Sequence, residues 1–185
     1  MDLIPRRLTS QGSHNIGHKT SFCAFLYFRC EGAERPLREL FFDLLSEYKQ
    51  VDALGVCKAT SGAEKHQLGI QDELSARRND RFGEGYNDRA VQKYENYKFV
   101  VAFENVRKPG YVTEKIANAM LAGAIPIYLG DPKVTDIFNE HSFINCGKYA
   151  HLKDCVAKVQ EIDSNDNMYV FTRHGDFEAS CGVSY

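Results

Sequence analysis

Three largely apolar runs, at residues 22–28, 98–103 and 124–129, constrain the fold more than any other feature of this 185-residue chain. Apolar and polar residues do not alternate within them, which is typical of strands buried on both faces. Stretches with helical spacing lie between the runs. Because a chain in which strands and helices alternate forms a parallel sheet with right-handed crossovers, the sequence predicts an α/β fold.

The pattern between the runs predicts the helices. Apolar residues recur at helical spacing over residues 37–48, directly after Pro36, a residue that suits a first helical position. A second helix over residues 113–121 has Thr113 as its N-cap and Gly123 at its C-terminal end. Weaker patterns predict short strands at residues 51–53 and 142–145, a helix at residues 152–162, and another that begins near residue 165 and loses its pattern after His174.

One long segment, residues 54–96, is polar and dotted with glycine, which predicts an irregular surface stretch. Its arginines can contact phosphate, but a solvated charge cluster is the favoured interpretation. The arginines in question are Arg77, Arg78, Arg81 and Arg89. We therefore divide the chain into a lead-in at residues 1–20, one domain at residues 21–175 and an irregular tail at residues 176–185.

Composition excludes several classes of protein. A formal net charge of -2 argues against a dedicated nucleic-acid binder. No apolar stretch is long enough to span a membrane, so we expect no membrane contact from this chain itself. Arg6 and Arg7 are not followed by an apolar run, unlike the charged residues of a signal peptide, so any targeting segment is expected outside these residues.

The six cysteines include no Cys-x-x-Cys pair, which argues against a structural zinc site. In an oxidising compartment, Cys30 and Cys57 are the expected pair because both fall in predicted loops. Cys155 falls on the apolar face of a predicted helix and is expected there as a packing residue.

Two segments that follow predicted strands are candidate binding sites, because ligands of open α/β sheets bind at the carboxyl ends of the strands. The first, residues 103–115, leads through a Pro-Gly turn into a helix N-terminus, which attracts anions, and Lys108 or Lys115 can add a full charge. In the second, residues 130–132, Gly130 can let the backbone approach a ligand.

Each side chain in these segments also has an interpretation that needs no ligand. Glu114 and Lys115 can be solvated charges on a first helical turn, where Glu114 also stabilises the helix dipole. Tyr111 can be a packing residue. From these residues alone, the chain is an α/β domain with an anion or nucleotide site.

Longer motifs resemble one known family. Residues 97–105 (YKFVVAFEN), 109–115 (PGYVTEK), 122–130 (AGAIPIYLG) and 136–145 (DIFNEHSFIN) closely resemble the α1,3-fucosyltransferases of glycosyltransferase family 10. Arg38 and the segment FFDLLSEYKQVD at residues 41–52 are also similar, so the likeness covers about residues 20–170.

The resemblance implies a Rossmann-like parallel sheet with helices on both faces, similar to the C-terminal half of a GT-B glycosyltransferase. That half binds GDP-fucose. The N-terminal half binds the acceptor sugar and supplies a carboxylate base for inverting transfer, usually to the 3-hydroxyl of N-acetylglucosamine. Since this chain resembles only the C-terminal half, the catalytic base is unknown here and is expected in an N-terminal domain outside this sequence.

Six residues match positions that bind the donor in the family. Arg38 matches the arginine that contacts the diphosphate, with Arg35 as the alternative, and Lys115 matches a lysine near the same phosphates. Fixed Arg and Lys side chains can stabilise the charge that a departing GDP gains. The other four line the donor site or belong to the Phe-Glu-Asn motif at the strand end: Tyr111, Glu114, Glu104 and Asn105.

Cofactors, partners and location follow from the same resemblance. We expect GDP-fucose as donor substrate, a glycan as acceptor, and no cofactor. There is no Asp-x-Asp motif, which suggests that Arg and Lys take the place of a metal ion. A eukaryotic, full-length protein of this kind is expected at the lumenal side of the Golgi membrane. The alternatives are a non-catalytic or truncated GDP-sugar-binding module and an unrelated nucleotide-binding domain.

Overall fold

The structure, a computed structural model, describes residues 19–28, 35–55, 57 and 86–174. Its centre is a five-stranded sheet in the order β2-β1-β3-β4-β5, in which every neighbouring pair is parallel. The strands are β1 (Ser21–Phe25), β2 (Val51–Ala53), β3 (Tyr97–Phe103), β4 (Ile125–Leu129) and β5 (Ile144–Asn145). The predicted parallel α/β sheet is therefore confirmed.

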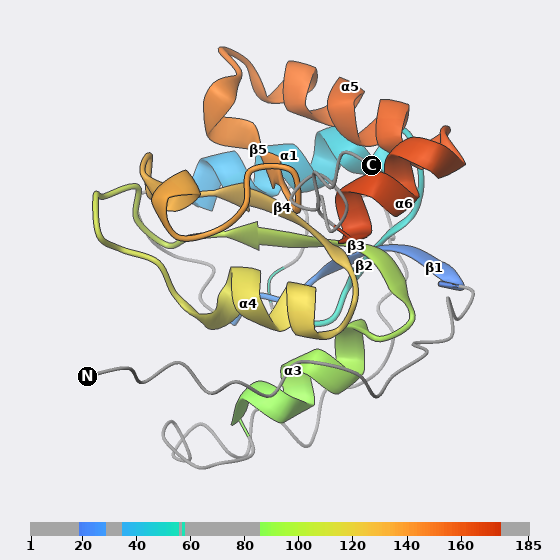
Figure 1. Cartoon of the computed structure of the whole chain (residues 1–185), viewed down its shortest axis with the longest axis horizontal. Coiled ribbons are helices and arrows are strands. Elements are labelled where there is room, and N and C mark those ends of the chain that lie inside the picture. Colours follow the sequence, from blue (N-terminus) through green and yellow to red (C-terminus); the bar gives the residue numbers. More distant parts are fainter. Residues whose placement is uncertain (1–18, 29–34, 56, 58–85, 175–185) are drawn as a thin grey trace, which may run out of the picture.

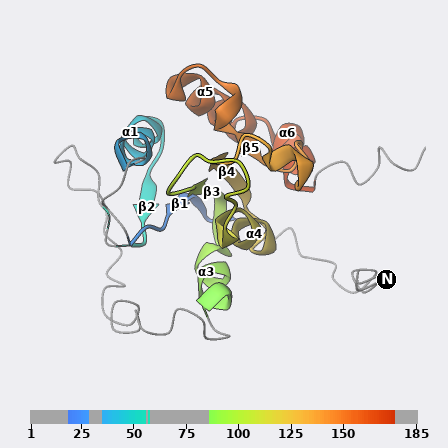
Figure 2. The same ribbon diagram turned by 90° about the vertical axis from the view of Figure 1, so that its left-hand side faces the viewer.

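Helices cover both faces of the sheet (Figures 1 and 2). One face carries α1 (Arg35–Ser46), α5 (Leu152–Asp163) and α6 (Asp166–His174), and the other carries α3 (Tyr86–Tyr94) and α4 (Glu114–Leu121). Two 3-10 turns, η1 (Val134–Asp136) and η2 (Cys146–Lys148), flank β5. This arrangement confirms the Rossmann-like expectation of helices on both faces.

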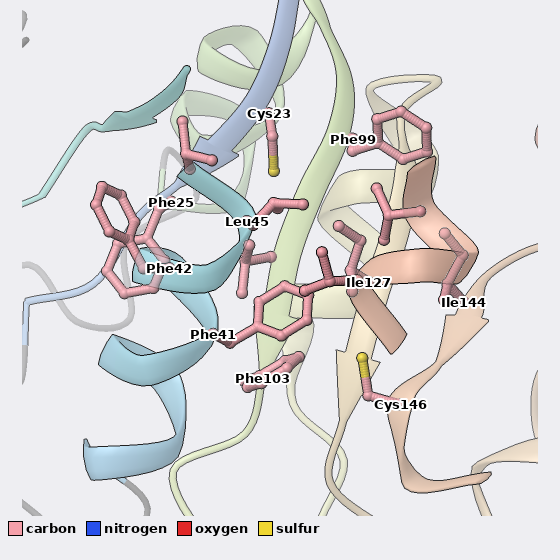
Figure 3. Packing of buried hydrophobic residues seen from close by; sticks show 14 of the residues in the cluster. Cys23, Phe25, Phe41, Phe42, Leu45, Phe99, Phe103, Ile127, Ile144 and Cys146 are labelled. Atoms are coloured by element: carbon pink, nitrogen blue, oxygen red, sulfur yellow. The ribbon is translucent and has the colours of Figure 1, made fainter. Parts of the chain in front are cut away.

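Aromatic side chains fill the layer between the sheet and α1 (Figure 3). The rings of Phe41 on α1 and Phe103 on β3 have centroids 4.8 Å apart, and those of Phe25 and Phe42 are 4.9 Å apart. All four side chains are at most 1% exposed. This packing fixes α1, and with it Arg38, against the carboxyl end of β3.

The structure differs most clearly from the predicted elements at two places. β1 ends at Phe25, and Tyr27, two residues later, bonds the backbone of β3 through its hydroxyl. The prediction that residues 54–96 are irregular is wrong for α3, where Ala90, Val91 and Tyr94 pack against the core. The arginine cluster at residues 77, 78 and 81 and the side chain of Arg89 lie outside the described residues. The boundaries of the lead-in and tail stay predictions.

The cysteines also depart from expectation. Cys155 is not an unpaired packing residue, since it forms a disulfide with Cys146. β5 and η2 bring Cys146 against the first turn of α5, and the Cα atoms are 5.3 Å apart, within the range that a disulfide spans. Cys57 is also disulfide-bonded, and its predicted partner, Cys30, lies outside the described residues. Cys23 is free and buried, and its burial raises the pKa of the thiol far above its usual value.

A buried carboxylate anchors the end of α5 to the amino end of the sheet. The side chain of Asp163 is fully buried and pairs with Lys49 and Lys98, and it accepts a hydrogen bond from Tyr48 at 3.1 Å. Burial alone raises the pKa of Asp163, but the hydrogen bonds from Lys49 and Lys98 outweigh it and leave that pKa below its usual value. The group therefore stabilises the fold in its charged form.

We expect Asp163→Asn to lower the free energy of unfolding by about 3 kcal/mol at pH 7, because it leaves two ammonium groups without their shared partner. A depressed folded pKa gives stability that is present above the unfolded pKa, about 3.9, and lost as pH falls through the folded pKa. The difference between wild type and variant should thus be constant above about pH 5 and shrink below pH 4.

Urea unfolding across this pH range measures the difference. Glu161→Gln, which removes an exposed pair with Lys158, is the control and should leave the unfolding midpoint unchanged. A difference for Asp163→Asn that stays constant down to pH 2 would contradict the assignment.

Candidate functional site

The carboxyl end of β3 is the centre of the candidate site. The chain continues from Phe103 into Glu104, whose backbone N–H donates to the carbonyl of Leu129 at 2.7 Å and extends the pairing with β4. Residues 104–113 then connect β3 to α4. The sequence-predicted residues Glu104, Asn105, Tyr111, Glu114 and Lys115 all lie on this connection or on the first turn of α4.

Glu104 and Lys115 form an ion pair in which the carboxylate is buried and the lysine is partly exposed. The Glu104 side chain is fully buried and accepts hydrogen bonds from the Thr113 N–H and the Thr113 hydroxyl, both at 2.7 Å. Lys115 Nζ donates to Glu104 Oε2 at 3.1 Å and to Thr113 Oγ1 at 2.9 Å. Thr113 is the N-cap residue as predicted, but its side chain bonds Glu104 instead of a helix N–H.

Arg38 and Asn105 form the second pair. Arg38 extends from α1 and donates through Nη1 to the side-chain oxygen of Asn105 at 2.7 Å. Its guanidinium carbon lies 4.7 Å from the centroid of the Tyr27 ring, and the residue is 3% exposed. The side chain of the alternative, Arg35, lies outside the described residues.

Tyr27 supports this pair and was missed in the sequence. Its hydroxyl accepts from the Phe103 N–H at 2.7 Å and donates toward the carbonyls of Val101 and Phe103 at 3.1 and 3.0 Å. Burial raises the pKa of Tyr27 well above its usual value, which keeps the hydroxyl protonated as a donor. Because Tyr27 stands in an apolar run, its sequence pattern is that of a packing residue.

A hydrogen bond connects the two candidate segments that the sequence singled out, residues 103–115 and 130–132. Gly110 has φ of 78°, and the Tyr111 N–H donates to the Lys108 carbonyl at 3.0 Å, which closes a Pro-Gly turn. The Gly110 N–H also donates to Asp131 Oδ2 at 2.8 Å. Asp131, which is 3% exposed, therefore holds the turn that carries Tyr111 to the end of β4.

Gly130 is needed for a reason other than the one predicted. A Cβ atom at this position would lie 2.4 Å from the Tyr128 hydroxyl oxygen and 2.5 Å from Glu104 Cγ. The space beside Gly130 is thus filled by protein side chains, so packing alone requires a glycine here, and the close approach of its backbone to a ligand stays a prediction. Tyr128 is itself fully buried, which raises its pKa to about 12, and its hydroxyl accepts from the Asp131 N–H at 3.0 Å.

The candidate site combines buried anchors with more accessible groups. Arg38 and Glu104 are buried, whereas Asn105, Tyr111, Glu114 and Lys115 keep part of their surface exposed. The cations come from opposite faces of the sheet, since Arg38 lies on α1 and Lys115 on α4 (Figure 1). Two fixed cations at one strand end can hold an anion such as a diphosphate.

A half-open cleft of about 480 Å³ lies elsewhere, between β5, α5 and α6. None of the six sequence-predicted residues lines it. Its two lysines, Lys148 and Lys158, are already paired with Glu140 and Glu161. The cleft is therefore separate from the candidate site.

Within the described ranges, no group of three or more His, Cys, Asp or Glu side chains is placed to hold a metal ion. No helix in that part of the chain is long and apolar enough to cross a membrane. The independence from metal that the sequence suggests stays a prediction.

Comparison with known proteins supports a single family. The sequence profile described as glycosyltransferase family 10 (fucosyltransferase), C-terminal region, matches residues 16–174. A putative fucosyltransferase of Acanthamoeba polyphaga mimivirus is 38% identical over 154 residues, which is 83% of this chain and 23% of that protein. The α-(1,3)-fucosyltransferase of Helicobacter pylori is 28% identical over 147 residues, 79% of this chain and 26% of that protein.

The fold has a solved counterpart. A crystal structure of α1,3-fucosyltransferase with GDP-fucose superposes with a TM-score of 0.64 at 26% identity, covering 84% of this chain and 39% of that one. The chain thus spans about a quarter of the length of these relatives and about two fifths of the solved enzyme.

Proposed function

Because this chain belongs to glycosyltransferase family 10, the fucosyltransferases, we propose that the carboxyl edge of its sheet binds GDP-fucose. The observation that carries the proposal is the placement of two cations, Arg38 and Lys115, at the end of β3. The solved relative that this fold resembles was crystallised with GDP-fucose. Asn105, Tyr111 and Glu114 complete the proposed donor site from the same connection.

The chemistry of the site fits a nucleotide sugar. When the bond between fucose and GDP breaks, negative charge develops on the β-phosphate. Arg38 offers a planar fork of N–H donors and Lys115 a point charge, and both are already fixed before the donor arrives. The site therefore stabilises the leaving group without a metal ion in this proposal.

We propose that the complete enzyme transfers fucose with inversion to the 3-hydroxyl of N-acetylglucosamine in a glycan. A general base must take the proton of that hydroxyl, and such a base typically contributes about 10²- to 10⁴-fold. The chain covers about two fifths of the solved enzyme. We assign the base and the acceptor site to the portion of the enzyme that this chain does not match.

We propose a lumenal, oxidising compartment, such as the Golgi, for the protein. Disulfides persist in secretory compartments and are rare in the cytosol. The bond between Cys146 and Cys155 and the disulfide-bonded state of Cys57 support this location.

The proposal is tested by thermal unfolding with GDP. A ligand that binds only the folded state stabilises it by about 2.7 kcal/mol at 100 times its Kd. For a chain of this size we expect the melting temperature to rise by about 5–10 °C. Guanosine, which lacks the diphosphate, is the control and should give a much smaller rise. A flat curve up to millimolar GDP, on protein shown to be folded, would contradict the donor site.

A further inference from the structure

We infer that Glu104 is a positioning residue that holds the Lys115 ammonium in place for the donor diphosphate, and that it does not itself contact the donor. This inference rests on the proposed function. It departs from the sequence-based expectation that Glu104 belongs to the ligand-contacting set.

The geometry leaves Glu104 no free surface. Its side chain is 0% exposed, Oε1 accepts from the Thr113 N–H, and Oε2 accepts from the Thr113 hydroxyl and from Lys115 Nζ. On its other side, Glu104 Cγ occupies the space that a Cβ on Gly130 would need. A ligand hydroxyl could reach this carboxylate only by displacing Thr113 or Lys115.

Lys115, in contrast, is held in place but does not spend all of its hydrogen-bond donors on protein groups. An ammonium group has three N–H donors, and Lys115 directs two of them to Glu104 and Thr113. Within the described part of the chain no acceptor takes the third donor, which we assign to a phosphate oxygen, and 19% of the side chain is exposed. The pair thus presents one donor of a fixed cation toward solvent.

Holding Lys115 improves binding because the side chain is ordered in advance. A free lysine loses the freedom of its flexible stem when it binds a phosphate, whereas Glu104 and Thr113 order Lys115 before the ligand arrives. Glu104 therefore acts on the donor only through Lys115.

A double-mutant cycle on the full chain tests this dependence, with GDP affinity measured by calorimetry. Glu104→Gln removes the charge that holds Lys115, and we expect it to weaken GDP binding about tenfold, the lower range for a hydrogen bond to a charged group. In a Lys115→Ala chain the same change should cause no further loss of GDP affinity, because Glu104 then has no lysine to hold. Additive effects of the two substitutions would show that Glu104 contacts the donor itself and would overturn the inference.

A second pair of variants leaves Glu104 in place. Thr113→Ser keeps the hydroxyl that bridges Glu104 and Lys115 and should keep the GDP affinity, whereas Thr113→Val should weaken it. Full affinity in Thr113→Val would also overturn the inference.

Asp52 offers a matched control, since it is another buried carboxylate of the sheet. It lies on β2, where it accepts hydrogen bonds from the Tyr97 hydroxyl at 2.9 Å and from Gln50 at 2.7 Å. Asp52→Asn should lower stability without changing GDP affinity. If the unsubstituted chain binds no GDP, the proposed function itself fails, whereas an additive cycle in a chain that binds GDP overturns only the role of Glu104.

Discussion

Replacing Lys115 by alanine is expected to lower the affinity for GDP by about 10- to 150-fold, because a charge-assisted hydrogen bond contributes about 1.5–3 kcal/mol. Lys115 stands on the first turn of α4, where the helix dipole adds to its own charge. Its ammonium is fixed by Glu104 and Thr113, so a phosphate gains the full contact without ordering a flexible side chain.

Lys108 is the matched control, because it lies five residues before Thr113, the N-cap of the same helix. It is exposed in the Pro-Gly turn, where its backbone carbonyl accepts a hydrogen bond from the Tyr111 N–H. A solvent-exposed charge is screened at physiological salt, so Lys108→Ala should change GDP affinity little. Calorimetry of both variants at the same ionic strength measures the difference. Equal losses in the two would refute the assignment of Lys115 to the diphosphate.

The sheet could be predicted because its three longest strands, β1, β3 and β4, fall in largely apolar runs. β3 and β4 lie within a residue of the predicted runs, and their side chains are buried almost throughout. α3 could not be predicted in the same way. Three of its residues, Ala90, Val91 and Tyr94, pack against the core, and so few contacts give a weak pattern in a polar stretch.

The residues of the site could be predicted, but their partners could not. The family motif singled out Arg38 and Asn105, which are 67 positions apart, yet only the packing of α1 on β3 shows that they bond each other. Asp131 was noticed as part of a strand end, and its role in holding Gly110 depends on the path of another segment. Contacts of this kind are chosen by tertiary structure and leave no local pattern.

The disulfide between Cys146 and Cys155 likewise could not be predicted from local sequence. An even number of cysteines permits many pairings, and sequence position favoured Cys30 with Cys57. The bond between Cys146 and Cys155 depends on how β5 and η2 meet α5, which becomes apparent only in the folded chain. An apolar helix face is an equally suitable place for a packing cysteine and for one in a disulfide.

Replacing Gly130 by alanine is expected to lower the free energy of unfolding by about 3 kcal/mol, the upper part of the range for overpacking a core. The new Cβ would lie within 2.7 Å of Tyr128 side-chain atoms and 2.5 Å from Glu104 Cγ. Neither neighbour can move easily. Tyr128 is fully buried and bonds the Asp131 N–H, and Glu104 is held by Thr113 and Lys115.

Gly110→Ala separates this steric effect from backbone strain. Gly110 has φ of 78°, but a Cβ there meets nothing within 4 Å, so only the cost of a left-handed residue applies, about 1 kcal/mol. Urea unfolding of both variants measures the two costs. Because Gly130→Ala pushes directly on Glu104, it should also weaken GDP binding, whereas the packing argument fails if Gly130→Ala unfolds at the same urea concentration as Gly110→Ala.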